Sequence, residues 1–149
     1  MEVFTDRYFM NEALKEAKKA FENDEVPVGA VVVVHDQIIA KAYNQVELLK
    51  DPTAHAEMLA ITSAANFLGS KYLTDCTIYV TLEPCLMCAS ALFWSKISRV
   101  VFAAADDKNG YMRFGKGVLH PKTKVEYGLM EPESRVLLQS FFEQKRKQG

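Results

Sequence analysis

The sequence predicts one α/β domain over residues 1–149, in which a mixed sheet is covered by helices. Three observations lead to this fold class. The length and the 49% hydrophobic content suit one buried core, segments with helical and with strand periodicity alternate along the chain, and no linker, repeat or composition break divides it. With only 7 Gly and 5 Pro, the chain is not of a disordered or collagen-like type.

The expected elements alternate between helix and strand after an initial hairpin. In order, they are a helix over 9–21, strands over 28–34 and 37–43, a loop over 44–52, a helix over 53–68, a strand over 77–82, a helix over 85–94, a strand over 99–104, a polar loop over 106–122, a later short strand and a last helix. Strands separated by helices are expected to be parallel, and those of the hairpin antiparallel.

Local signals justify the elements of the first half. Apolar residues recur at helical spacing over 9–21, where Thr5 or Asp6 can cap the helix and Asn23-Asp24 can end it. Two β-branched runs flank His35-Asp36, which reads as a tight hairpin turn.

The second half carries similar signals. Gly69 is expected to stop the helix over 53–68, and Pro132 to open the last helix. The apolar stripe of that last helix consists of Leu137, Leu138, Phe141 and Phe142. The helix ends in the basic run Lys145-Arg146-Lys147.

Charge and cysteine content bound the function. The net charge is −1, but residues 91–149 alone carry +5, which either forms a surface for a polyanion or is simply solvated. No apolar stretch is long enough to span a membrane, and Met1 to Met10 does not resemble a signal peptide, so no membrane contact is expected. Three cysteines, an odd number, argue for a reducing, cytoplasmic location.

Two short motifs carry residue types that bind metals. His55-Ala56-Glu57 lies near the start of one expected helix, and Pro84-Cys85-Leu86-Met87-Cys88 follows a strand. One helix and one strand join the two motifs. Both helix N-termini are therefore expected to meet at one edge of the sheet.

The spacing of these residues suits a catalytic zinc site. Cys85 and Cys88 lie one helical turn apart, and a helix N-terminus favours the thiolates that zinc binds. With His55 they supply three ligands, so water takes the fourth position and its pKa falls toward ~7. Glu57 does not share a helix face with His55, and we therefore expect it to move protons rather than to bind the metal.

Two other interpretations of the cysteine pair remain open. A Cys-x-x-Cys motif alone also occurs in thiol redox proteins, and a closed structural zinc site would take a fourth protein ligand. The spare candidates are His35, His120 and Cys76, and none of them is paired at ligand spacing. Cys76 is expected to be a small buried apolar residue.

Together, the two motifs resemble those of the zinc-dependent cytidine and nucleobase deaminase superfamily. Several further segments are similar to bacterial tRNA adenosine deaminases: 26–30, 51–57, 79–85 and 99–102. The resemblance extends from about Tyr8 to the C-terminal helix. It implies a three-layer α/β/α cytidine-deaminase-like fold with a central mixed five-stranded sheet, one zinc ion per subunit and a homodimer whose sites use both subunits.

The resemblance also implies an activity, the hydrolysis of adenosine to inosine at the wobble position of a tRNA anticodon loop. Zinc-bound hydroxide would be the nucleophile and Glu57 the proton shuttle, with His55, Cys85 and Cys88 as the zinc ligands. Residues implied to contact the substrate are Asn44, Val28 and Ala56. For Asn44, local turn chemistry is the alternative explanation.

One segment departs from the family pattern. Tyr111-Met112-Arg113-Phe114 stands where the family commonly has small residues, and Ala105 stands where it commonly has Arg. Tyr111, Arg113, Phe114 and Lys116 are therefore candidate RNA contacts, with a dimer interface as the alternative for the two aromatic residues. Two other functions remain open: a free nucleobase or nucleoside deaminase of the guanine or cytosine type, and a non-catalytic zinc-stabilised binding module.

Overall fold

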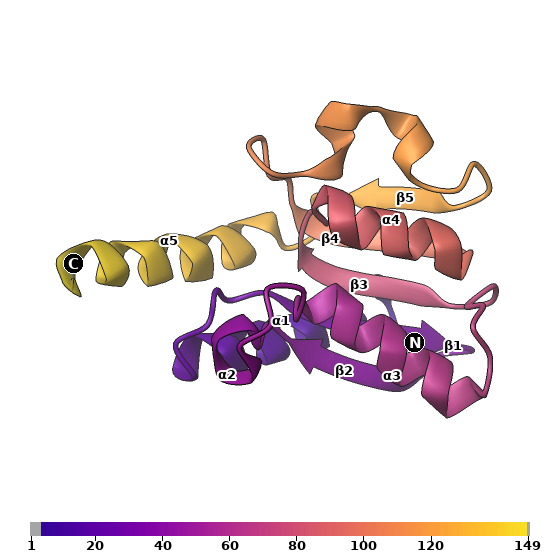
Figure 1. Ribbon diagram of the computed structural model, residues 1–149, viewed down its shortest axis with the longest axis horizontal. Coiled ribbons are helices and arrows are strands. Elements are labelled where there is room, and N and C mark those ends of the chain that lie inside the picture. Colours follow the sequence, from indigo (N-terminus) through magenta and orange to yellow (C-terminus); the bar gives the residue numbers. More distant parts are fainter. Residues whose placement is uncertain (1–3, 149) are drawn as a thin grey trace.

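The computed structural model describes residues 4–148, so residues 1–3 and 149 of the expected domain lie outside it. Figure 1 shows a sheet with helices on both faces. The elements are α1 (Asp6–Glu22), β1 (Gly29–Val34), β2 (Gln37–Tyr43), α2 (Val46–Leu49), α3 (Ala56–Leu68), β3 (Thr77–Leu82), α4 (Leu86–Ser95), β4 (Arg99–Ala104), the 3-10 turns η1 (Tyr111–Phe114) and η2 (Lys116–Val118), β5 (Lys124–Tyr127) and α5 (Glu131–Gln148).

The sheet is mixed and five-stranded, with the strand order β2-β1-β3-β4-β5. β1 pairs antiparallel with both β2 and β3, whereas β3, β4 and β5 are parallel. This confirms the predicted fold class, the antiparallel hairpin and the parallel pairing of the later strands. At the hairpin turn, His35 and Asp36 both adopt positive φ, the backbone conformation that two-residue turns require.

Alternation along the strands explains the two helical layers. Ala30 and Val32 of β1 belong to the buried cluster that includes α3 and α4, whereas Val31 and Val33 pack with α1. Gly29 permits this close approach of α1, because a Cβ atom there would lie 2.1 Å from the Ala13 carbonyl oxygen.

Several predicted boundaries were wrong for local reasons. The helix predicted from Thr53 begins at Ala56, because the Asp51 carboxylate accepts hydrogen bonds from the Thr53 N–H (2.8 Å) and hydroxyl (2.7 Å) and holds a turn there. The segment predicted as a loop over 44–52 contains α2, and the loop over 106–122 contains η1 and η2. The last helix begins at Glu131, one residue before Pro132.

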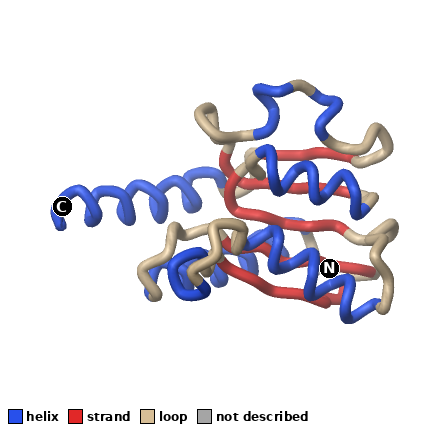
Figure 2. Tube along the Cα trace, in the orientation of Figure 1, coloured by secondary structure: helices blue, strands red, loops and turns tan. Residues whose placement is uncertain are grey.

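The segments that form the candidate site lie at one end of the strands. The start of β1 and the ends of β2, β3 and β4 lie there, and Figure 2 shows the loops after β2 and β4 on the side from which α5 departs. The Ser134 hydroxyl fixes the start of α5 by donating to the Thr81 carbonyl (2.5 Å), and Phe141 packs edge-on against Phe21 of α1. No helix in residues 4–148 is long and apolar enough to cross a membrane.

Candidate metal centre and pocket

Three residues meet where α3 and α4 begin. His55 is the N-cap of α3, Cys85 is the N-cap of α4, and Cys88 lies in the first turn of α4. The His55 Nδ1 atom is 3.7 Å from Cys85 Sγ and 3.4 Å from Cys88 Sγ, and the potential ligand atoms all lie within 4.8 Å of one another. Zn–S bonds of about 2.3 Å and Zn–N bonds of about 2.0–2.1 Å at tetrahedral angles place such atoms about 3.6 Å apart. The three residues therefore fit a zinc ion.

The electrostatics of this cluster also suit a cation. A hydrogen bond from the Cys88 thiol, together with the nearby His55 ring, lowers the pKa of Cys85 to about 4. The same hydrogen bond and burial raise the pKa of Cys88, and the Cys85 side chain raises that of His55. The second thiolate thus needs a positive charge to stabilise it, which a divalent metal supplies.

Glu57 lies beside the cluster, in the first turn of α3, and is only 4% exposed. Loss of hydration raises its pKa to about 7, the Cys85 thiolate also raises it, and the His55 charge works in the opposite direction. A carboxyl group with a pKa near neutrality can both accept and donate a proton.

Asn44 connects the end of β2 to the start of α3. Its Oδ1 atom accepts from the Ala56 N–H (2.8 Å), and its Nδ2 atom donates to the Val26 carbonyl (3.1 Å). Asn44 therefore does bond the local turn, as the alternative explanation predicted. One Nδ2 hydrogen and one Oδ1 lone pair of its side chain are left for another partner. Ala56 is completely buried and its N–H donates to Asn44, and its contact with substrate stays a prediction.

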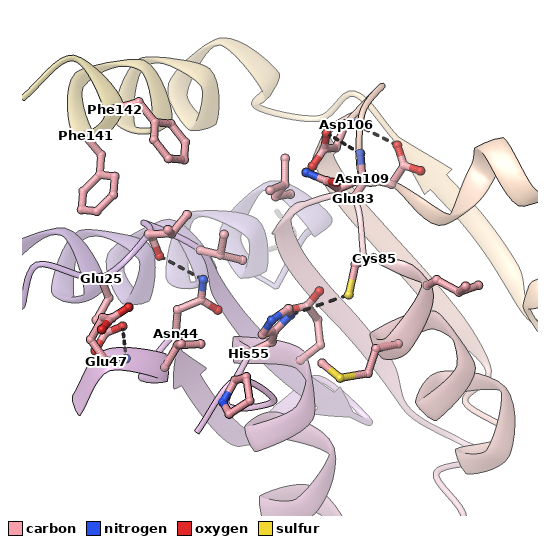
Figure 3. Close-up of a pocket in the computed structure, with 18 of the residues that line it drawn as sticks. Glu25, Asn44, Glu47, His55, Glu83, Cys85, Asp106, Asn109, Phe141 and Phe142 are labelled. Carbon is pink, nitrogen blue, oxygen red and sulfur yellow. Dashed lines mark hydrogen bonds between the residues drawn. The ribbon is translucent and has the colours of Figure 1, made fainter. Parts of the chain in front are cut away.

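A pocket of about 1030 Å³ opens over the cluster (Figure 3). His55, Glu57 and Cys85 lie in its wall. Phe141 and Phe142 of α5 border one side. Other residues of the wall include Glu25, Val28, Asn44, Glu47, Glu83, Asp106, Asn109, Arg113, Phe114 and Lys145.

The four residues predicted to contact RNA have different positions. Arg113 and Phe114 line the pocket, and the Arg113 guanidinium lies 4.7 Å from the Phe114 ring centre. Tyr111 is only 4% exposed and packs edge-on against Phe102, and the contact of its ring with RNA stays a prediction. Burial raises the pKa of Tyr111 to about 12. Lys116 is exposed but does not line the pocket.

Two buried carboxylates in the pocket wall were missed by the sequence analysis. Glu25 is 2% exposed and Glu83 is 5% exposed. The only sequence signal for their burial is an apolar neighbour and a nearby proline: Glu25 lies two positions before a proline, and Glu83 lies one position before one. Each carboxylate accepts backbone N–H groups from a loop that is distant in sequence.

Comparisons with known proteins agree with this geometry. Residues 4–104 match the family model for the cytidine and deoxycytidylate deaminase zinc-binding region. A tRNA-specific adenosine deaminase of Aquifex aeolicus is 51% identical over 144 residues, which cover 93% of this chain and 95% of the relative.

Solved structures show the same likeness. One comes from a study of A-to-I editing by tRNA:A34 deaminases; it has a TM-score of 0.83 and 42% identity, and the match covers 88% of this chain and 99% of the other. A guanine deaminase of Bacillus subtilis matches with a TM-score of 0.64 and 37% identity over 70% of this chain and 66% of the other.

Proposed function

This chain belongs to the zinc-binding cytidine and deoxycytidylate deaminase family, and we propose that within it the chain hydrolyses adenosine to inosine at the wobble position of tRNA. The observation that carries the proposal is the 51% identity with a tRNA-specific adenosine deaminase over nearly the full length of both proteins. The pocket agrees with this function, because its lining includes Arg113 and Phe114 on one side and the α5 residues Phe141, Phe142 and Lys145 on the other, which are side chains of the types that contact phosphates and stack on bases.

In this proposal His55, Cys85 and Cys88 hold the zinc ion and leave one position open. Bound zinc lowers the pKa of a water molecule toward ~7 and so supplies a nucleophile for C6 of adenine. The N-terminal ends of α3 and α4 orient the three ligands.

Glu57 moves the protons. Its carboxylate takes a proton from the attacking water and delivers it to N1 of the adenine ring. It then moves the proton of the hydroxyl group now on C6 to the amino group, so that the C6–N bond breaks, ammonia leaves and C6 becomes a carbonyl. The overall reaction consumes one water molecule. The raised pKa of Glu57, about 7, suits a group that must be both base and acid in one cycle.

The remaining pocket residues hold the nucleotide. Asn44 offers its free amide hydrogen to the target base, and Val28 supplies apolar wall. A target base must leave its stack to reach the zinc, and single-stranded loops permit this. Bases next to the target stack on Phe114 at one side, with Arg113 beside it, and on Phe141 at the other, where the Lys145 ammonium lies 5.5 Å from the ring centre.

The proposal includes a homodimer in the cytoplasm. On the α4 and η1 side, Trp94 is 74% exposed, Met112 is 43% and Leu86 is 41%, and a second copy of the chain would cover these apolar side chains. Sedimentation of the wild-type protein and of Trp94→Asp measures this assembly; we expect a dimer for the former and a monomer for the latter. The three free cysteines suit a reducing compartment.

The decisive experiment measures ammonia release and inosine formation by the zinc protein. An anticodon stem-loop with adenosine at the wobble position is offered beside free adenine, adenosine, guanine and cytosine. We expect inosine in the stem-loop alone and a binding constant for the stem-loop that falls with salt, with a log–log slope of about −0.7 for each phosphate contact. An untouched stem-loop in the presence of active, zinc-loaded enzyme would contradict the proposal.

A second candidate is deamination of a free purine such as guanine. The specific observation in its favour is the 37% identity with the guanine deaminase of Bacillus subtilis. The same assay decides between them, because ammonia released from guanine without inosine in the stem-loop would support this candidate. A free base would also show little dependence on salt.

A further inference from the structure

Glu83 occupies the turn between β3 and α4, two residues before Cys85. Its two carboxylate oxygens accept two backbone hydrogen bonds from one distant loop. Oε1 accepts from the N–H of Asp106 and Oε2 from the N–H of Met112, both at 2.9 Å. Figure 3 shows Glu83 beside Asp106 and Asn109 at the pocket wall. Hydrogen bonds to a buried charged group are among the stronger ones in proteins, so this pair ties the loop firmly.

The loop between these two amides, residues 106–112, is itself a closed turn. The Asp106 carboxylate accepts from the N–H groups of Lys108 and Asn109, both at 3.1 Å, and the Asp106 carbonyl accepts from the N–H of Gly110 (2.9 Å). Gly110 is required by the contact with Glu83, because a Cβ atom there would lie 2.1 Å from Oε2. The Glu83 carboxylate thus holds both ends of one preformed turn.

The anchored turn leads directly into residues that face the pocket. Asn109 lies within it, and Arg113 and Phe114 follow it immediately. Phe114 is 51% exposed, so packing alone does not fix its position. The backbone in front of it is held by two bonds: the Tyr111 N–H donates to the Pro84 carbonyl (2.9 Å), and the Met112 N–H, two residues before Phe114, donates to Glu83.

Glu25 also accepts two backbone hydrogen bonds with its two carboxylate oxygens, on the other side of the pocket. Its oxygens accept from the N–H groups of Glu47 (3.0 Å) and Leu48 (2.8 Å), which begin the short helix α2. The pocket therefore lies between α2 and the 106–112 turn, and each is tied by one buried carboxylate with both oxygens engaged. This symmetry supplies a matched control, because Glu25 makes equivalent bonds to a different loop.

We propose that Glu83 is a positioning residue for substrate: it sets the 106–112 turn so that Arg113 and Phe114 meet the nucleotide next to the target adenosine. The proposal rests on the function proposed above. Glu83 touches no reacting atom in this role, since both of its oxygens are committed to backbone amides. Its effect reaches the substrate only through the loop.

The test is a mutant cycle. Glu83→Gln is measured alone and in the background of Arg113→Ala with Phe114→Ala, using KM and kcat on the wobble-adenosine stem-loop. In the wild-type background we expect the KM to rise by about 5- to 100-fold, because one of the two amides then faces an NH2 group instead of an oxygen. In the double-alanine background the same change should have little further effect, because the residues it positions are gone. Glu25→Gln should have the same effect in both backgrounds.

Three outcomes would overturn the proposal. An equal effect of Glu83→Gln in both backgrounds would show that Glu83 does not act through Arg113 and Phe114. Loss of zinc from Glu83→Gln would show that the carboxylate supports Cys85 instead. Unchanged hydrogen exchange at the amides of Asp106 and Met112 would show that the loop does not depend on it.

The exchange measurement also separates this proposal from the proposed function. If the wild-type protein leaves the stem-loop untouched, the RNA function fails. Exchange in Glu83→Gln and Glu25→Gln then decides by itself whether Glu83 holds its loop, with loosening confined to residues 106–112 as the expected result.

Discussion

Two groups of ionisable side chains lie on opposite faces of the sheet and behave differently. The first is the metal cluster of His55, Glu57, Cys85 and Cys88, at the N-termini of α3 and α4. The second, which we term the Arg99 network, joins Arg99 at the start of β4 to Asp6, Tyr79 and Glu126 on the α1 side. Both contain shifted pKa values, so a shift alone does not identify a functional site.

The direction of the shifts separates the two groups. In the Arg99 network the guanidinium bonds both oxygens of Asp6 (2.8 and 2.6 Å), which lowers the pKa of Asp6 and raises that of Arg99. Each charge there is stabilised by its partner. In the metal cluster burial raises the pKa of Glu57 to about 7, and the pKa of Cys88 is raised as well. That cluster holds more acidic groups than its positive charge can stabilise in ionised form, and a bound cation would stabilise their ionised forms.

Removal of zinc is the strongest way to break this comparison. We expect a chelator to abolish turnover and to lower the melting temperature, because the cluster then loses the cation that its thiolates require. Added zinc should restore both. Metal analysis, turnover and thermal unfolding on the same samples check this. Full turnover in protein proven to be free of metal would contradict it.

The next largest effect is expected from Glu57→Gln. This change keeps the shape of the side chain but removes the proton acceptor, so kcat should fall by about 10²–10⁴ while zinc stays bound. Glu16→Gln is a suitable control, because Glu16 is also a buried carboxylate but pairs with Lys19 on α1 (2.8 Å). A Glu57→Gln protein that has lost its zinc would argue that Glu57 supports the metal rather than the proton transfers.

The metal cluster and the hairpin were predictable from the sequence, because they rest on local patterns. The two β-branched runs around His35-Asp36 predicted the antiparallel hairpin, and the motif spacing predicted that His55 meets the two cysteines. These features depend on residues close in the chain or on the known geometry of adjacent loops.

The rest depended on contacts between distant residues. Glu25 and Glu83 bond amides more than 20 positions away, and nothing in their neighbourhoods specifies those partners. The burial of Tyr111 likewise depends on a distant residue, because its ring packs edge-on against Phe102. Asn44 had two explanations, and only the positions of Val26 and Ala56 show that the turn explanation holds in part.

Arg99→Leu tests the Arg99 network, in which opposite charges are paired. It removes the cation that serves both Asp6 and Glu126, so we expect the free energy of unfolding to fall by about 1–3 kcal/mol. Turnover well below the melting temperature should not change, since the network lies away from the pocket lining. Urea unfolding and the deaminase assay check the two parts. A loss of turnover in folded, zinc-loaded Arg99→Leu protein would mean that the two groups are coupled.

The smallest expected effect is the pH dependence of Asp6, and its sign follows from the network. The bonds to Arg99, and then that from Tyr79, hold the pKa of Asp6 below its usual value of 3.8. The stabilisation by ionised Asp6 is therefore fully present above that value and is lost as the pH falls through the lower pKa of the folded protein. Asp6→Asn lacks this contribution at every pH, so the stability difference between wild type and variant should be largest near neutral pH and shrink in acid. Urea midpoints measured across this range check the prediction, and a difference that stays constant into acid would mean that the carboxylate charge adds nothing to the network.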